Sequence, residues 1–141
     1  MKTLKTFAAA LLMALSFSVF ASDEPNNQKL SMDYAVKAYI DAVSHGKIKG
    51  LSEVLDNDVK FTVTRGENII NYSKSEMLNS MKGSQNLEQN CQTDYSVMEL
   101  NGTQAVVKVT MKYEAFSKVN IVTLANTTKG WKITNVSSSF V

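Results

Sequence analysis

The sequence has little of what metal sites, catalytic dyads and disulfides are made from. Its 141 residues include one histidine, one cysteine, one proline and one arginine. The single cysteine, Cys91, excludes an internal disulfide, so buried apolar side chains must hold the fold together. One histidine and scattered acids do not make a metal site, and there is no Gly-rich phosphate loop or Gly-x-Ser-x-Gly motif. We therefore expect no metal and no cofactor, and we interpret Cys91 as an incidental thiol.

Long apolar runs are also missing, and the one short run predicts an export signal. Lys2 and Lys5 precede the apolar residues 7–20, and Val19 and Ala21 suit positions −3 and −1 of a cleavage site. The run has about 14 residues, against the roughly 20 that span a bilayer, so we expect cleavage near Ala21 and no stable membrane anchor. The predicted product is periplasmic or secreted. It would consist of a flexible polar tail, residues 22–29, and one domain, residues 30–141.

The processed chain has no excess of positive or negative charge. Lys2 and Lys5 leave with the signal, so the 15 basic residues of the precursor become 13, equal to the 13 acids. A neutral chain with a single arginine, Arg65, lacks the electrostatic footprint of a nucleic-acid-binding protein. We therefore expect no nucleic-acid partner.

The first half of the domain predicts three helices. Apolar residues recur at helical spacing between Ser31, a suitable N-cap, and Gly46, a suitable left-handed C-cap. A short second helix is expected over residues 48–55, ended by the turn-forming Asp56-Asn57-Asp58. Ser73 and Glu76 form a capping box that opens a third helix, which Gly83 closes.

Strands follow the second helix and fill the second half of the chain. Apolar and polar residues alternate over residues 59–64, which predicts a strand with one buried face, and residues 69–71 could return beside it. Further strands are expected at 95–100, 105–116, 119–125 and 131–141, with Asn101-Gly102 as a hairpin turn. Hairpin connections predict an antiparallel sheet, and helices followed by a meander indicate an α+β fold with helices on one face.

Three segments of this pattern resemble the nuclear transport factor 2-like superfamily, a cone-shaped α+β fold with N-terminal helices packed on a curved antiparallel sheet. The segments are Tyr39–Val43 with Gly46, Leu51–Val59 with the strand of Phe61, and Gly130–Val136. The superfamily includes ketosteroid isomerase and scytalone dehydratase, and the chain looks most similar to its exported proteins called putative lumazine-binding. A cystatin-like fold is the structural alternative, although the extra helices around Leu51 and Met77 argue against it.

The resemblance implies a ligand pocket at the wide end of the cone, between the first helix, the first strand and the inner face of the sheet. Alternation alone does not decide which face of each late strand is the inner one, and every candidate could equally be an ordinary core residue. The candidate pocket residues are Tyr39, Phe61, Val63, Met77, Met81, Tyr95, Met111, Tyr113 and Asn135.

The same resemblance argues against catalysis of the isomerase type. Tyr39 takes the place of the oxyanion-hole tyrosine of ketosteroid isomerase, but the place of the general base falls on Val63. The second oxyanion-hole acid falls near Asn120. Without a base the reaction is lost, so we expect no catalytic residue. Asp41 and His45 are four residues apart and could form a dyad on a helix face, but we expect both to be surface residues.

Taken together, these features predict an exported, non-catalytic protein that binds a small, mostly apolar molecule. Two alternatives stay open. One is a homodimeric interaction module that pairs through the outer sheet face, with Trp131 as an anchor. The other is an isomerase- or dehydratase-like enzyme with an unrecognised site.

Overall fold

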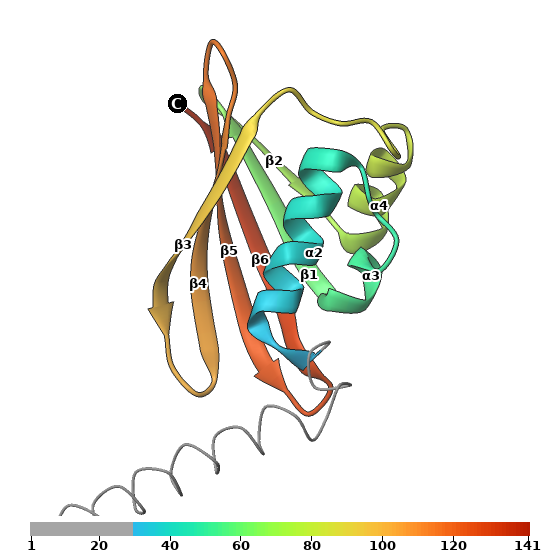
Figure 1. Ribbon diagram of the computed structural model, residues 1–141, viewed down its shortest axis with the longest axis vertical. Helices are drawn as coiled ribbons and strands as arrows, with labels where there is room; N and C mark the ends of the chain where they lie inside the picture. Colours follow the sequence, from blue (N-terminus) through green and yellow to red (C-terminus); the bar gives the residue numbers. More distant parts are fainter. Residues whose placement is uncertain (1–29) are drawn as a thin grey trace, which may run out of the picture.

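A computed structural model describes residues 30–141, so the predicted signal peptide and tail lie outside the described residues. The described part contains three helices and six strands in the order α2-α3-β1-β2-α4-β3-β4-β5-β6, labelled as in Figure 1. The helices are α2 (Met32–His45), α3 (Leu51–Val54) and α4 (Lys74–Lys82). The strands are β1 (Leu55–Arg65), β2 (Asn68–Tyr72), β3 (Gln92–Leu100), β4 (Gln104–Lys112), β5 (Ser117–Thr127) and β6 (Gly130–Phe140). None of these helices is long and apolar enough to cross a membrane.

The six strands form one curved sheet in the order β2-β1-β6-β5-β4-β3, and all three helices lie on one side of it (Figure 1). This confirms the predicted α+β fold. One pairing differs from the expectation of an antiparallel sheet, because β1 and β6 run parallel while the other four pairs are antiparallel. Hairpin turns predict only the pairing of strands that follow one another in the chain. They could not predict this pair, since β1 and β6 are far apart in the sequence and no hairpin joins them.

The caps of the long helices form as the sequence predicts. The Ser31 hydroxyl accepts a hydrogen bond from the Tyr34 N–H at the start of α2, and Gly46 ends the helix in the left-handed conformation with φ of 68°. Ser73 and Glu76 make both bonds of the capping box that opens α4. Each such cap contributes about 1 kcal/mol, so local sequence sets where these helices begin.

The expectation for the second helix is wrong in its length and in its ending. Helix α3 has four residues, and β1 begins directly at Leu55, so Asp56-Asn57-Asp58 lies inside a strand. The pairing of β1 with β6 shifts between Leu55 and Lys60, and the Asp56 carboxylate accepts a hydrogen bond from the Asp58 N–H. The turn propensity of these residues is therefore expressed as an irregularity within the strand rather than as a break.

The late strands have different ends from those predicted, and the differences are largest at the start of β3 and the end of β4. Strand β3 begins three residues earlier than expected, at Gln92, and β4 ends at Lys112. Residues 113–116 instead form a turn, closed by a hydrogen bond from the Tyr113 N–H to the Phe116 carbonyl. The Asn101 carboxamide oxygen accepts from the N–H groups of Thr103 and Gln104, which stabilises the predicted hairpin turn.

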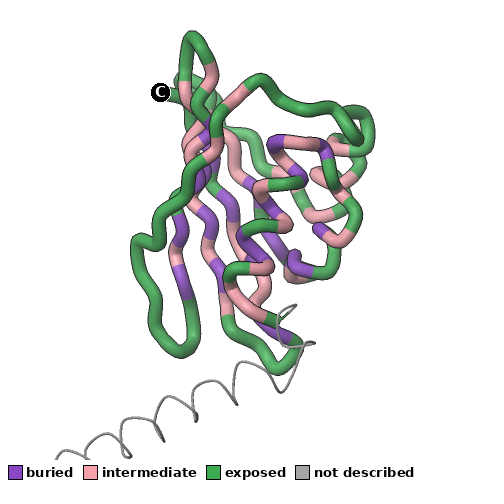
Figure 2. The backbone as a smooth tube through the Cα atoms, viewed as in Figure 1, coloured by how far each residue is buried: buried purple, intermediate pink, exposed green. Residues whose placement is uncertain are grey.

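The core lies between α2 and the inner face of the central strands, where Figure 2 shows the buried residues. Burying each aliphatic side chain contributes about 1.5–3 kcal/mol. Trp131 is half-buried and packs against this core, so its proposed use as an anchor on the outer face is wrong. The inner-face core residues of β4, β5 and β6 are Ala105, Val107, Val109, Val122, Leu124, Ile133 and Val136.

Candidate functional site

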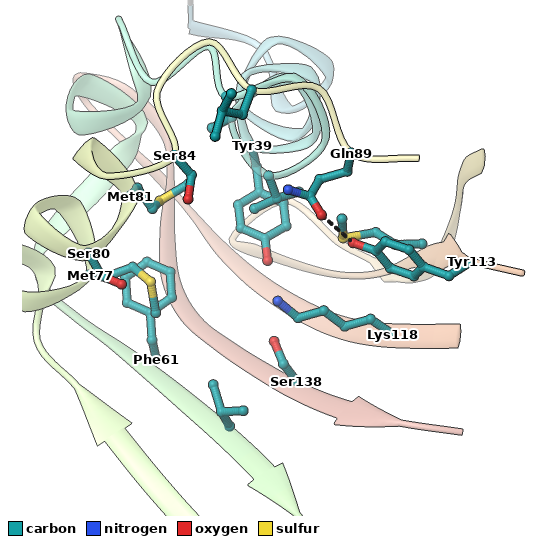
Figure 3. A pocket seen from close by; sticks show the side chains of 16 residues that line it. Tyr39, Phe61, Met77, Ser80, Met81, Ser84, Gln89, Tyr113, Lys118 and Ser138 are labelled. Carbon is teal, nitrogen blue, oxygen red and sulfur yellow. Dashed lines mark hydrogen bonds between the residues drawn. The ribbon is translucent and has the colours of Figure 1, made fainter. Parts of the chain in front are cut away.

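Side chains do not fill the space between α2, α4 and the inner face of the sheet, and a cavity of about 230 Å³ remains there (Figure 3). It lies at the end of the sheet where α2 finishes and β1 ends, and residues from the segment after α4 complete its wall. Its lining consists of Tyr39, Ala42, Val43, Gly46, Phe61, Val63, Met77, Ser80, Met81, Ser84, Leu87, Gln89, Met111, Tyr113, Lys118 and Ser138.

The structure brings seven of the nine predicted pocket residues together around this cavity. They come from four separate parts of the chain, which the fold places side by side. Whether they bind a ligand is a separate question that stays a prediction. The seven are Tyr39, Phe61, Val63, Met77, Met81, Met111 and Tyr113.

Tyr95 does not line the cavity. It lies on β3, the edge strand, where it pairs with the buried Val109 and so faces the inner side of the sheet. Its side chain is nevertheless 37% exposed, because α2 covers the middle of the sheet and β3 stands beyond it (Figure 1). Tyr95 was a candidate through the resemblance, and neither the resemblance nor the alternation showed where the helical cover stops.

Asn135 does not line the cavity either, and the reason is a β-bulge. Leu124 pairs with Ile133 while its neighbour Thr123 pairs with Asn135, so Thr134 is an extra residue in β6. Because side chains alternate with a period of two, this extra residue moves Asn135 to the outer face, opposite Lys60.

Polar groups gather on one side of the cavity. Figure 3 shows the Tyr39 hydroxyl, the Lys118 ammonium and the Ser138 hydroxyl directed toward the same region. The Ser138 hydroxyl donates to the Asn120 carboxamide oxygen at 2.6 Å, and the Asn120 nitrogen donates to the Val109 carbonyl at 3.3 Å. These bonds hold Ser138 in place. Burial raises the pKa of Tyr39, with the Ser138 hydroxyl acting in the opposite direction, so Tyr39 stays a neutral hydroxyl at pH 7.

Lys118 is the cavity residue that sequence reasoning missed most clearly. The predicted strand began at Val119, so Lys118 fell outside it, whereas β5 begins at Ser117. Lys118 pairs with the buried Met111 and therefore shares the inner face with Asn120 and Val122. Burial lowers the pKa of Lys118, and the nearby positive charge of Arg65 lowers it further. The alternation of β5, extended two residues toward the N-terminus, would have found it.

The segment after α4 docks on the end of α2 and closes one side of the cavity. The Asn86 N–H donates to the Gly46 carbonyl at 3.0 Å, and the Gln89 N–H donates to the Ser44 carbonyl at 2.6 Å. The Tyr113 hydroxyl donates to the Gln89 carboxamide oxygen at 3.2 Å. Burial raises the pKa of Tyr113, and the neighbouring Cys91 raises it further.

The carboxylate base that the isomerase-type mechanism needs is not among the residues that line this cavity. Val63 lines it, and the residues of its lining include no aspartate or glutamate. His45 contacts Ser44 at 2.7 Å and Glu88 at 3.4 Å rather than Asp41, so the suggested Asp41–His45 dyad is wrong. Within residues 30–141, no group of histidine, cysteine, aspartate and glutamate side chains could hold a metal ion.

Solved structures similar to this one share its fold at low sequence identity. A nuclear transport factor 2-like protein of unknown function from Silicibacter pomeroyi has a TM-score of 0.64 and 12% identity, covering 78% of this chain and 92% of that one. A cystatin-like fold protein from Burkholderia xenovorans has a TM-score of 0.61 and 13% identity, with 84% and 95% covered. A protein from Streptomyces avermitilis, described as a putative dehydratase of the same fold family, has a TM-score of 0.59 and 19% identity, with 84% and 99% covered.

The sequence comparisons give the family. No curated protein matches the chain. The profile of the family described as "Putative lumazine-binding" matches residues 28–138, which is nearly the whole predicted domain. The chain therefore belongs to this family, and its fold is similar to that of nuclear transport factor 2-like proteins.

Proposed function

We propose that this protein is an exported, non-catalytic binder of a small, mostly apolar molecule. The observation that carries the proposal is the cavity of about 230 Å³ at the wide end of the sheet. An interior packed only for stability leaves few voids larger than a water molecule. The cavity is half open to solvent and bounded by side chains from α2, β1, α4 and β4, so a small molecule could enter and occupy it.

The size of the cavity limits that occupant. A cavity of about 150 Å³ lined by aliphatic and aromatic side chains holds benzene, whereas drug-sized ligands occupy about 300–1,000 Å³. A volume of about 230 Å³ falls between these cases. The ligand is accordingly a fragment-sized molecule of roughly ten to fifteen non-hydrogen atoms. Lumazine, the molecule in the family's description, is of this size class and is the first compound to test.

The absence of catalysis rests on two positions taken from the resemblance to ketosteroid isomerase. Val63, at the place of the general base, lines the cavity and has no proton to exchange. Asn120, near the place of the second oxyanion-hole acid, is buried and its carboxamide is engaged with Ser138 and Val109. Tyr39 keeps the place of the oxyanion-hole tyrosine, but a donor without a base does not support proton transfer.

Export is part of the proposal and rests on the first 21 residues. Their basic start, short apolar run and small residues before the cleavage site support a periplasmic or secreted protein. Fractionation of cells that express the full chain tests this directly. The processed protein, beginning near Ser22, is expected outside the cytoplasm, and an unprocessed chain in the cytoplasm would contradict export.

Native mass spectrometry of the purified protein tests ligand binding. The wild type is expected to carry an additional small mass, which organic extraction releases. Val63→Phe places a larger side chain in the cavity and is expected to abolish this mass. Thr64→Phe is the matched control, since Thr64 is the next residue of β1 and faces the opposite side of the sheet. A Val63→Phe variant that carries as much ligand as the wild type would refute the proposed location.

A further inference from the structure

The cavity contains one charged side chain, and it is a cation. Of the sixteen residues that line it, Lys118 alone is charged. Within residues 30–141 the one ion pair joins His45 and Glu88, so Lys118 has no carboxylate partner there. Lys118 is half-buried, and an ammonium group partly removed from water without an opposite charge is unfavourable for folding. An unpaired ammonium in the wall of a cavity therefore points to a ligand whose charge offsets this unfavourable free energy.

The hydrogen-bonding groups beside Lys118 also favour a ligand that accepts hydrogen bonds. An ammonium group offers three N–H donors and no acceptor. The Ser138 hydroxyl already donates its hydrogen to Asn120, so toward the cavity it can only accept. A hydrogen bond also joins Ser138 and Tyr39, and because Ser138 can only accept, the Tyr39 hydroxyl donates to it. The N–H groups of Lys118 are therefore the donors left for a ligand in this region (Figure 3). That region suits an acceptor-rich group.

Arg65 adds a second positive charge at this end of the sheet. Its guanidinium lies over the ring of Phe140, 5.0 Å from the ring centre, and Phe140 pairs with Lys118 across β5 and β6. Arg65 is close enough to lower the pKa of Lys118. Two like charges near each other and a cavity lining without carboxylates produce a positive potential at the polar side of the cavity.

We propose that the cavity selects a small amphipathic acid, whose carboxylate contacts Lys118 and whose apolar body lies against Phe61, Met77 and Met81. The inference rests on the proposed function, since it assigns a ligand class to the same cavity. Lys118 is the residue that determines specificity. Charge-assisted hydrogen bonds from an ammonium are about twice as strong as neutral ones, which is enough to discriminate an acid from its amide.

Three probes with one apolar body and different head groups test the proposal: 3-phenylpropanoate, 3-phenylpropanamide and 3-phenylpropylamine. Isothermal titration at pH 7 is expected to show the acid binding roughly tenfold more tightly than the amide. The amine is expected to bind most weakly. Equal affinity of acid and amide, or no binding of the acid, would overturn the proposal. Binding of the amide without preference for the acid would overturn it while leaving the proposed function intact.

Two lysine variants attribute the effect to Lys118. Lys118→Met keeps the length and apolar stem of the side chain, and it is expected to reduce acid affinity to that of the amide. Unchanged binding of the amide shows that this variant is folded. Lys108→Met removes the same charge from an exposed position on the outer face of β4, and it is expected to leave the preference unchanged. An acid preference that survives in Lys118→Met, or that Lys108→Met removes equally, would contradict the assignment.

Discussion

The two ends of the inner sheet face are built from the same strands but have opposite character. At the end where α2 begins, β5 and β6 place Leu124, Val122, Ile133 and Val136 in a solid core, each 1% exposed or less. Toward the end where α2 finishes, β5 continues with Asn120 and Lys118, and β6 with Ser138 and Phe140. The first end is packed and apolar, whereas the second holds the cavity.

This difference shows that stability and function occupy separate lengths of the same strands. The packed end can hold the sheet against α2 without help, because its side chains are apolar and fully buried. The open end can then carry features that do not favour folding, such as an unfilled space and a lysine without a carboxylate partner. Truncation of a side chain should therefore cost more stability at the packed end than at the open end, where removal of the lysine should stabilise the protein. The following experiments are given from the largest expected effect to the smallest.

The largest effect is expected from truncation at the packed end. Leu124→Ala removes a fully buried side chain and is expected to lower the free energy of unfolding by about 3 kcal/mol. Met81→Ala, in the half-buried wall of the cavity, is expected to lower it by less than about 1 kcal/mol, because the space beside it is already open. Urea denaturation measures both values. Equal losses would mean that the two ends are packed alike.

A smaller effect is expected where the open end is closed by the segment after α4. Gly46 has φ of 68°, and an added Cβ would lie 2.6 Å from the backbone of residues 84 and 86. Gly46→Ala is therefore expected to cost about 2–3 kcal/mol and to weaken the amide protection of residues 86–89 in hydrogen exchange. Gly66→Ala has a similar φ of 59° but open space around it, so it reports backbone strain alone, about 1 kcal/mol. If Gly46→Ala were no worse than Gly66→Ala, the docked segment would contribute nothing.

Removal of the cavity lysine is expected to stabilise the protein. Lys118→Met ends the burial of an unpaired charge and should raise the free energy of unfolding at pH 7 by about 1 kcal/mol. The pKa of Lys118 lies below its usual 10.5 in the folded protein. The penalty is therefore complete below that lowered pKa and disappears as the pH rises toward 10.5. The titratable groups near Lys118 are Arg65, Tyr39 and Tyr113, and burial raises the pKa of both tyrosines.

Thermal unfolding of the wild type and Lys118→Met between pH 7 and pH 10 measures this difference. The two melting temperatures should converge as the pH increases. A variant that is less stable than the wild type at pH 7 would show that Lys118 supports the fold rather than the ligand.

The smallest change in stability is expected from a substitution on the outer face of the sheet. We propose that any homodimer forms through this face, where Ile121 is half-buried at the centre of β5, rather than through Trp131. Ile121→Glu is expected to convert a sedimenting dimer to monomer with a change in unfolding free energy of less than about 0.5 kcal/mol. A wild type that sediments as a monomer at micromolar concentration would exclude the homodimer.

Local chemistry was enough to predict most of this fold. The caps at Ser31, Gly46 and Ser73 and the inner alternation of β4 depend on neighbouring residues, and the structure confirms them. Seven candidate residues line the cavity, and these depended on the resemblance to the superfamily, because alternation alone did not decide the inner face of the late strands. The places that could not be predicted depend on distant partners. The bulge at Thr134 requires the pairing of β5 with β6, and the exposure of Tyr95 depends on how far α2 extends over the sheet.

The most direct test of the central claim uses the methionine methyl groups, which report on both ends of the inner face. Met77, Met81 and Met111 line the cavity, Met32 packs on the core at the start of α2, and Met98 is 60% exposed on β3. Titration of ¹³C-methyl-labelled protein with the neutral probe 3-phenylpropanamide is expected to shift the signals of Met77, Met81 and Met111 and to leave those of Met32 and Met98 unchanged. A titration that shifts Met98 alone, or none of the methionines, would contradict the claim that the cavity binds a small molecule.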